Sequence, residues 1–106
     1  MAARVREVAW AESARGALDS VIEYIAQDSP QAAIQLLGAA LDLAASLATL
    51  AERGRVVPEL NDPRIREVFV QKYRLQYQVG DRQVLVVAFL HGARDFTTWR
   101  KGQRQE

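Results

Sequence analysis

Few side chains in this chain of 106 residues are suited to metal or thiol chemistry. The chain has no cysteine, so disulfides and thiolate zinc sites are excluded. His91 is the only histidine, so a metal site made of protein ligands would need carboxylates, and no clustered pair of acidic residues suggests one. We therefore expect no metal and no cofactor. The single imidazole and the cationic side chains are what remains for chemistry.

The cationic residues are concentrated in the second half of the chain. Residues 1–50 carry three basic and six acidic side chains, a net charge of −3, whereas residues 51–106 carry eleven basic and seven acidic ones, a net charge of +4. This asymmetry indicates that the second half meets an anion, either nucleic acid or an acidic protein, although ordinary surface charge would give the same count. Trp99 stands beside Arg100 and Lys101. It is the aromatic residue that we expect to be exposed, as a contact anchor for a partner.

Two amphipathic helices are predicted before this basic half. The first runs from Glu12 or Ser13 to Asp28 and has one apolar stripe at helical spacing. Ser29 as N-cap and Pro30 at the first helical position begin the second, which we expect to extend to Arg53 with Gly54 as its stop.

A helix of that length spans roughly 35 Å, whereas strands of six to eight residues span about 20–26 Å. The second helix therefore carries more apolar surface than a small sheet covers. We expect a partner or a second copy of the chain to contact part of it, through Leu36, Leu43 and Leu47.

Four strands are predicted around the helices. Residues 4–10 alternate as a short edge strand, residues 54–64 read as a loop, and strands follow at 64–70, 73–79 and 84–90, with a tight turn at Gly80-Asp81-Arg82. The last strand is apolar on both sides, as in a central strand or one covered on both faces. We expect Trp10, Tyr24 and Phe89 in the core and structural roles for Tyr73 and Tyr77.

These elements define an α+β fold of order β-α-α-β-β-β, in which a helical hairpin packs on a small antiparallel sheet. One domain over residues 1–100 and a polar tail at 101–106 account for the chain. The N-terminus carries charges where a signal peptide would be apolar, and Asp42 interrupts the central apolar run. We therefore expect a cytoplasmic protein.

The order and spacing of short motifs over nearly the whole chain resemble the ParE/RelE toxin family of bacterial type II toxin–antitoxin modules. The motifs are Val8-x-Trp10, Ile22-Glu23-Tyr24-Ile25, Ser29-Pro30-x-Ala32-Ala33, Gly54-Arg55, Arg66-Glu67-Val68, Tyr73-Arg74-Leu75-x-Tyr77 and Leu90-His91-Gly92-Ala93-Arg94-Asp95. The Ser-Pro-x-Ala-Ala segment and the His-Gly-Ala-Arg ending are more similar to the ParE (plasmid stabilisation) branch than to the RelE branch. The resemblance implies a RelE/ParE-like fold and a cognate antitoxin that blocks the toxin.

The two branches imply different activities. ParE-type members inhibit DNA gyrase, whereas RelE-type members cleave mRNA on the ribosome. In the RelE branch, two arginines that hold phosphate match Arg74 and Arg94 here, and His91 is a candidate base. The RelE enzymes add a tyrosine or histidine near the C-terminus, where this chain has Trp99-Arg100. The catalytic set is therefore incomplete.

Each candidate residue also has a purely structural interpretation. Arg74 can lie on the exposed side of its strand and pair with Glu67 across the hairpin, His91 can cap a strand end, and Arg94 can pair with Asp95. Three hypotheses follow. The first is a gyrase inhibitor that uses Arg74, Arg94, Trp99, Arg100 and Lys101 as contacts, the second is a ribosome-dependent ribonuclease, and the third is an inactive member that only binds its antitoxin.

Overall fold

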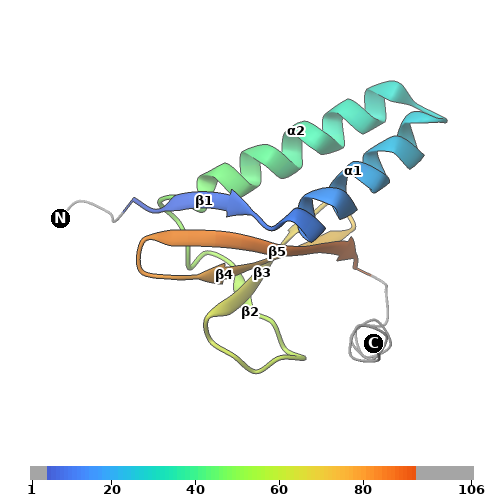
Figure 1. The fold of residues 1–106 in the computed structure, drawn as a ribbon. Helices are drawn as coiled ribbons and strands as arrows, with labels where there is room; N and C mark the ends of the chain where they lie inside the picture. Colours follow the sequence, from blue (N-terminus) through green and yellow to red (C-terminus); the bar gives the residue numbers. More distant parts are fainter. Residues whose placement is uncertain (1–4, 93–106) are drawn as a thin grey trace.

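The computed structural model describes residues 5–92 as two layers, a helical hairpin over one face of a sheet (Figure 1). The elements in chain order are β1 (Glu7–Trp10), α1 (Glu12–Ala26), α2 (Pro30–Ser46), β2 (Arg55–Val56), β3 (Ile65–Val70), β4 (Tyr73–Val79) and β5 (Gln83–His91). The predicted α+β class and the order of the main elements are confirmed. Neither helix has the length and apolar content that a membrane span needs within this part of the chain.

The sheet has the order β1-β5-β4-β3-β2. The strands from β2 to β5 pair antiparallel, and β1 occupies the predicted edge. Two features were not predicted. β1 pairs parallel to β5, with Val8 opposite Val84, and the short strand β2 forms the other edge where a loop was expected. Parallel neighbours cannot be joined by a tight hairpin turn, and here both helices and the strands β2, β3 and β4 lie between β1 and β5 in the chain.

The helical hairpin begins as predicted. In α1, Ala14 and Leu18 lie on the buried stripe. The side chain of Ser29 accepts a hydrogen bond from the amide of Ala32 at 3.1 Å, which caps α2. The prediction that Tyr24 belongs to the core is wrong, because this residue lies off the buried stripe of α1 and is 74% exposed.

The predicted end of α2 is also wrong, because the helix ends at Ser46. The hydroxyl of Ser46 bonds back to the carbonyl of Leu43 at 2.6 Å, and the next amides bond three residues back, as Leu47 does to Ala44 at 3.0 Å. Gly54 therefore does not end the helix. A side chain at Gly54 would place Cβ 2.5 Å from the carbonyl oxygen of Glu67, so the glycine permits a close backbone approach.

The shorter helix changes the expected surplus of apolar surface. Its 17 residues span about 25 Å, which matches the length of the strands. Leu36 and Leu47 are completely buried, so no surface of theirs is left for a partner in this conformation, and the expectation that they contact one is corrected. Leu43 is half-buried, and Ile34 is 69% exposed. A homodimer through the helices stays a prediction.

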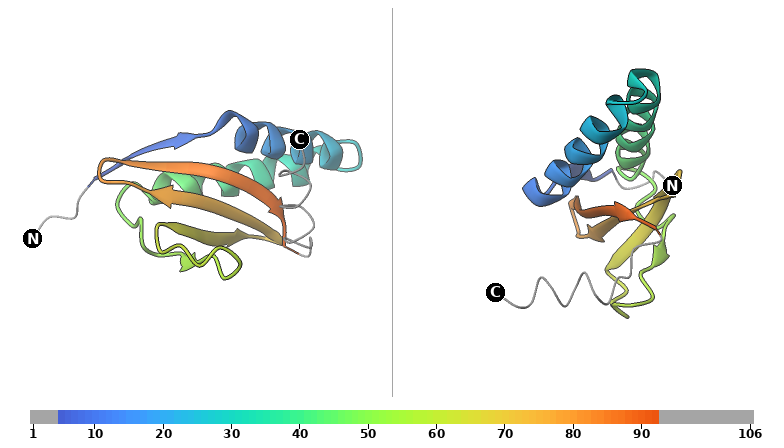
Figure 2. Two further views of the ribbon diagram at one scale, coloured as in Figure 1. Left: turned by 60° about the horizontal axis from the view of Figure 1, so that its bottom comes forward. Right: turned by 90° about the vertical axis from the view of Figure 1, so that its right-hand side faces the viewer.

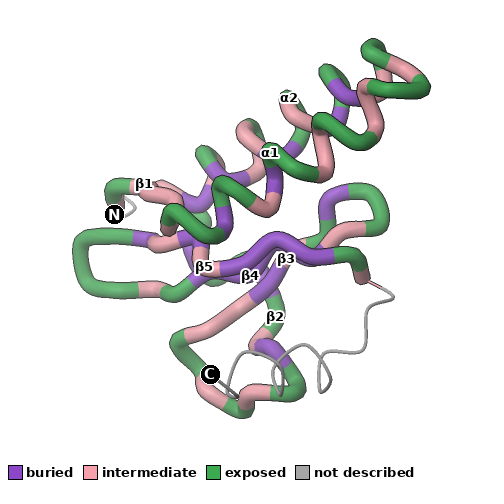
Figure 3. The backbone as a smooth tube through the Cα atoms, turned by 45° about the vertical axis from the view of Figure 1, so that its right-hand side comes forward, coloured by how far each residue is buried: buried purple, intermediate pink, exposed green. Residues whose placement is uncertain are grey.

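A β-bulge in β5 explains why this strand is apolar on both sides. Val86 lies opposite Tyr77, but Ala88 lies opposite Gln76, so β5 has one extra residue at this point. Before the bulge, Val84 and Val86 point towards the helices. After it, Ala88 and Leu90 are buried on the opposite face, which we call the outer face. The prediction of a strand that is central or covered on both faces is confirmed, since β5 lies between β1 and β4 and has buried residues on both faces. Figure 3 shows the buried stretches along β4 and β5.

Candidate functional site

The outer face of the sheet carries a cluster of charged side chains around a buried ion pair. Strand pairing sets Arg55 of β2 opposite Glu67 of β3, and Glu67 opposite Gln76 of β4. Arg74 lies on the same face, since it is two residues before Gln76 on the same strand. The connection of residues 57–64, between β2 and β3, lies on this side of the sheet, opposite the helices (Figures 1 and 2). It places Glu59 over the cluster.

Glu67 is the centre of the cluster. Its Oε1 atom accepts hydrogen bonds from Nε of Arg74 at 2.7 Å and from the side-chain Nε2 of Gln76 at 3.1 Å. Its other oxygen, Oε2, accepts a hydrogen bond from Nε of Arg55 at 2.7 Å. The Glu67 side chain is 0% exposed. Burial raises the pKa of Glu67, but the hydrogen bonds from Arg74, Gln76 and Arg55 together outweigh it and hold the pKa below its ordinary value. Glu67 is therefore an ionised carboxylate inside the protein.

Arg74 joins this buried carboxylate to a second one. Its Nη2 lies 2.8 Å from Oε1 of Glu59, and its Nη1 lies 3.2 Å from Oε2 of the same carboxylate. The hydrogen bond from Arg74 lowers the pKa of Glu59, while the two carboxylates raise the pKa of Arg74. The guanidiniums of Arg55 and Arg74 balance the carboxylates of Glu59 and Glu67, so the cluster is electrically neutral. A buried charge such as that of Arg74 or Glu67 requires a partner of opposite charge.

Of the predicted catalytic residues, the structure describes Arg74 and His91, and these two do not lie together. The expected pairing of Arg74 with Glu67 is confirmed, but the expected exposure of Arg74 is wrong, because Glu59 and its connection cover the guanidinium. His91 pairs with Tyr73 across β4 and β5, and its ring meets that tyrosine edge-on at 5.3 Å. Since neighbouring residues of a strand point to opposite faces, Arg74 and His91 lie on opposite sides of the sheet. Arg94, Trp99, Arg100 and Lys101 lie outside the described residues.

Three members of the cluster were missed from the sequence. Arg55 lies on β2, in a segment that was expected to be a loop. Gln76 is two residues after Arg74, so strand alternation could have placed it on the same face. Glu59 belongs to a connection with no periodic pattern, so no sequence signal pointed to it. Within residues 5–92, no group of three histidine or acidic side chains is arranged to hold a metal ion.

Comparison with known proteins supplies the family. A family model described as the ParE toxin of the type II toxin–antitoxin system parDE matches residues 8–96. This chain belongs to the ParE toxin family. It is therefore a toxin of a type II toxin–antitoxin system, and the family implies a cognate antitoxin as its partner.

One curated protein and one solved structure are similar to this ParE-family toxin. It is 37% identical to Toxin RelE2 of Caulobacter vibrioides over 89 residues. This match covers 83% of this chain and 97% of the relative. Its fold is similar to that of a chain in the structure titled "Chromosomal ParDE TA system from P. aeruginosa", with a TM-score of 0.68 and 15% sequence identity, over 83% of this chain and 97% of the other.

The surface of this ParE-family toxin has a hollow between α2 and the end of β3. Its volume is about 420 Å³, and its lining combines apolar groups with one acidic and one basic side chain: Ala39, Asp42, Leu43, Ser46, Arg53, Phe69, Val70 and Gln71. Phe69 is 52% exposed, and the guanidinium carbon of Arg55 lies 5.5 Å from the centre of its ring. Of the three helical leucines expected to contact a partner, Leu43 lines this hollow.

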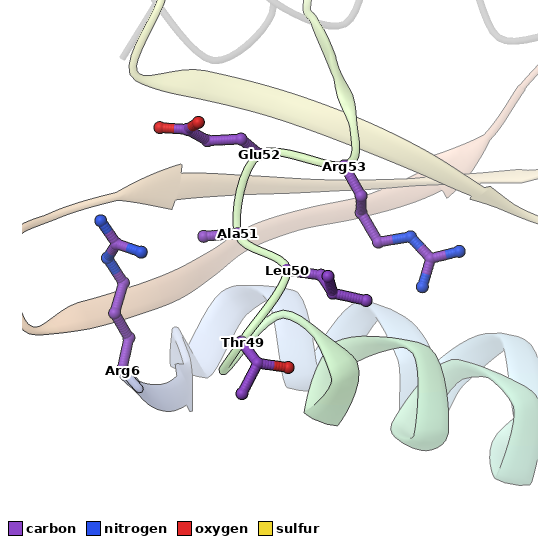
Figure 4. A pocket seen from close by; sticks show the side chains of 6 residues that line it. All are labelled: Arg6, Thr49, Leu50, Ala51, Glu52 and Arg53. Carbon is purple, nitrogen blue, oxygen red and sulfur yellow. The ribbon is translucent and has the colours of Figure 1, made fainter. Parts of the chain in front are cut away.

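A second hollow lies where the chain passes from α2 to β2. Arg6 directly precedes β1, and the other lining residues form the segment 49–53 (Figure 4). Nε of Arg6 donates to the carbonyl of Gly80 at 2.7 Å, and its backbone amide donates to the carbonyl of Ala48 at 2.8 Å. Arg6 therefore ties the edge strand to the end of the helix.

Proposed function

We propose that this ParE-family toxin acts by binding DNA gyrase and inhibiting it, and that its cognate antitoxin neutralises it. The observation that carries the proposal is the state of Arg74. This arginine matches a phosphate-holding residue of the RelE branch, yet its side chain is 5% exposed and bonds to Glu67 and Glu59. A guanidinium held by two carboxylates has little capacity left for a phosphate group of RNA.

The placement of His91 supports the same conclusion. Cleavage of RNA without a metal needs a base, an acid and cations around one phosphate. Arg74 and His91 point to opposite faces of the sheet and cannot act on one phosphate in this conformation. Binding a protein target requires no such convergence.

The contacts that we propose for gyrase lie in the basic second half. Arg94, Trp99, Arg100 and Lys101 combine cations with one aromatic anchor, the composition expected of a binding surface. For the antitoxin we propose the hollow beside Leu43, because the exposed ring of Phe69 offers apolar surface there.

A supercoiling assay with purified DNA gyrase tests the proposal. We expect supercoiling to fall as toxin is added. Arg100→Ala with Lys101→Ala should raise the concentration needed at least tenfold. The matched control removes two cations that are exposed elsewhere, with Lys72→Ala and Arg82→Ala, and should inhibit like the unchanged toxin. Supercoiling that is unaffected over a wide range of toxin concentration would reject the proposal.

Ribosome-dependent mRNA cleavage is the second candidate, because the 37% identical relative carries the name RelE2. Mapping the 5′ ends of transcripts after toxin induction decides between the two: new ends inside coding regions indicate cleavage, and intact transcripts in growth-arrested cells exclude it. An inactive member that only binds its antitoxin predicts no growth defect when the chain is expressed alone.

A further inference from the structure

The exposed side of α2 carries almost no charge. Asp42 is the one ionised residue among the 17 of this helix. On the neighbouring helix α1, by contrast, charged side chains line the exposed side, as is usual for a helix that faces water: Glu12, Arg15, Asp19 and Glu23. A highly charged partner such as nucleic acid finds no cation on α2, so the partner that fits this side is an uncharged protein surface.

Ile34 is the large apolar side chain on the exposed side of α2. It is 69% exposed, and it lies one turn before Gly38 on the same side of the helix. A single exposed isoleucine is ordinary on a protein surface, so its meaning depends on what lies beside it. Removing such a side chain from water is favourable, so a contact that covers it is stabilised.

Four residues that follow Ile34 form a shallow socket on the same side of α2. They are Gly38, Leu41, Asp42 and Ala45. Their spacing of i, i+3, i+4 and i+7 surrounds the position where a packed neighbouring helix inserts one side chain. Gly38 and Ala45 are exposed and small, and Leu41 is half-buried. Within residues 5–92, no atom beyond its own stretch of helix comes within 4 Å of the place that a Cβ of Gly38 would occupy. These four residues, which we call the α2 socket, can therefore accept an apolar side chain from outside.

Ile34 and the α2 socket are placed so that two copies of the helix fit each other. Gly38 is the middle residue of α2, which runs from Pro30 to Ser46. When two copies cross antiparallel at Gly38, Ile34 of one copy lies roughly 6 Å along the helix from the crossing point, and the centre of the other copy's socket lies roughly 5 Å from it in the same direction. Each Ile34 thus faces the socket of the other copy. A contact about a twofold axis needs this self-complementarity.

Asp42 does not oppose this arrangement. The two copies of Asp42 lie roughly 12 Å apart along the helices, beyond the distance of about 8 Å over which exposed charges interact at physiological salt. Gln35 is exposed and comes one turn before Gly38, whereas Asp42 comes one turn after it. In the antiparallel pair the side-chain amide of Gln35 therefore lies beside the carboxylate of Asp42 in the other copy and can donate to it.

We propose that two copies of this toxin bind each other through α2, antiparallel about Gly38, with Ile34 of each copy in the α2 socket of the other. The contact is separate from the proposed action on gyrase, and its tests use no gyrase. Two single helices bury less surface than a standard interface of about 1,600 Å², so the dimer is reversible and forms as the toxin concentration rises.

Sedimentation equilibrium of the purified toxin tests the contact. Ile34→Glu places a charge in front of the α2 socket. The matched control is Tyr24→Glu, which adds the same charge at a similarly exposed apolar residue of α1. We expect the dissociation constant of the dimer to rise about tenfold or more in Ile34→Glu, and to be unchanged in Tyr24→Glu. Both positions are exposed, so neither change disturbs the core.

The outcomes separate a specific contact from its alternatives. A toxin that stays monomeric up to about 1 mM has no such contact, and the proposal is overturned. Equal weakening by Ile34→Glu and Tyr24→Glu would show an effect of net charge, which also overturns it. A monomeric toxin whose binding to the antitoxin is lost in Ile34→Glu would assign this side of α2 to the antitoxin in place of a second copy.

Disulfide cross-linking tests the antiparallel geometry. The chain has no cysteine, so Gly38→Cys and Ala45→Cys each introduce a single thiol on the exposed side of α2. Across a close helix contact the Cα atoms of two Gly38 residues lie roughly 3.5–5.5 Å apart, which a disulfide can span. Those of two Ala45 residues lie roughly 21 Å apart along the helices. Under mild oxidation we expect Gly38→Cys to form a linked dimer about tenfold faster or more. Equal rates, or a faster reaction of Ala45→Cys, would overturn the antiparallel contact.

Discussion

The Nε atom of Arg74 lies 2.7 Å from Oε1 of Glu67, and the two side chains are 5% and 0% exposed. This pair links two neighbouring strands on the face of the sheet that the helices do not cover. It also determines which charges can be removed without unfolding the protein, because a buried charge that loses its partner is far more costly than an exposed one.

Replacement of Arg74 should therefore destabilise the fold. Arg74→Met leaves the carboxylate of Glu67 buried with fewer donors, and we expect the free energy of unfolding to fall by about 3–5 kcal/mol. Urea denaturation followed by circular dichroism measures this. The control is Arg15→Met, which breaks an exposed helical pair with Asp19 and should cost less than about 0.5 kcal/mol. Similar losses in the two variants would contradict a structural role for the buried pair.

Stability should fall in acid because of the two carboxylates that bind Arg74. The pKa values of Glu59 and Glu67 are both held below the ordinary value of 4.5. A carboxyl group whose pKa is lower in the folded state stabilises the protein above its unfolded pKa, and this stabilisation is lost as the pH falls through the folded pKa. The midpoint of urea unfolding should thus be steady near neutral pH and decrease below about pH 5. Glu59→Gln should have a flatter acid limb than the unchanged toxin, and an equally steep limb would contradict this assignment.

The hydroxyl of Tyr77 should contribute to stability through Gly54. It accepts a hydrogen bond from the amide of Gly54 at 3.0 Å, and Tyr77 is 0% exposed. Tyr77→Phe leaves that buried amide without its acceptor, so we expect a loss of about 1–3 kcal/mol in the free energy of unfolding. Tyr24→Phe, at an exposed position on α1, should have almost no effect. A Tyr77→Phe protein as stable as the unchanged toxin would mean that another group satisfies the amide.

The turn between β3 and β4 offers a stabilising substitution. Gln71 has a φ of 54°, which is unfavourable for any residue that has a Cβ. Gln71→Gly removes this strain, and we expect a gain of about 0.5–1 kcal/mol in thermal or urea unfolding. Gln71→Ala keeps the Cβ and should show little of the gain. A Gln71→Gly protein that is less stable than Gln71→Ala would indicate that the chain entropy of glycine outweighs the relief of strain.

Local features of the fold were predictable from the sequence. Three predicted features depend only on residues that are close in the sequence, and the structure has all three. They are the Ser29-Pro30 start of α2, the apolar stripe of α1 and the alternation along β4. The contact of Arg74 with Glu67 was predictable for the same reason, since two strands joined by a tight turn bring diagonal neighbours on one face within reach, and Arg74 is two residues before Gln76, which lies opposite Glu67. Sequence spacing is informative wherever the chain itself holds the partners close.

The tertiary structure alone decided the rest. The parallel position of β1 beside β5 and the bulge in β5 depend on contacts between distant segments. Glu59 reaches Arg74 across fifteen residues and a connection without periodicity, so no spacing rule relates them. The burial of Arg74 follows from that contact. A sequence pattern specifies which residues face the same way, whereas only the path of the whole chain specifies which charges it brings together and shields from water.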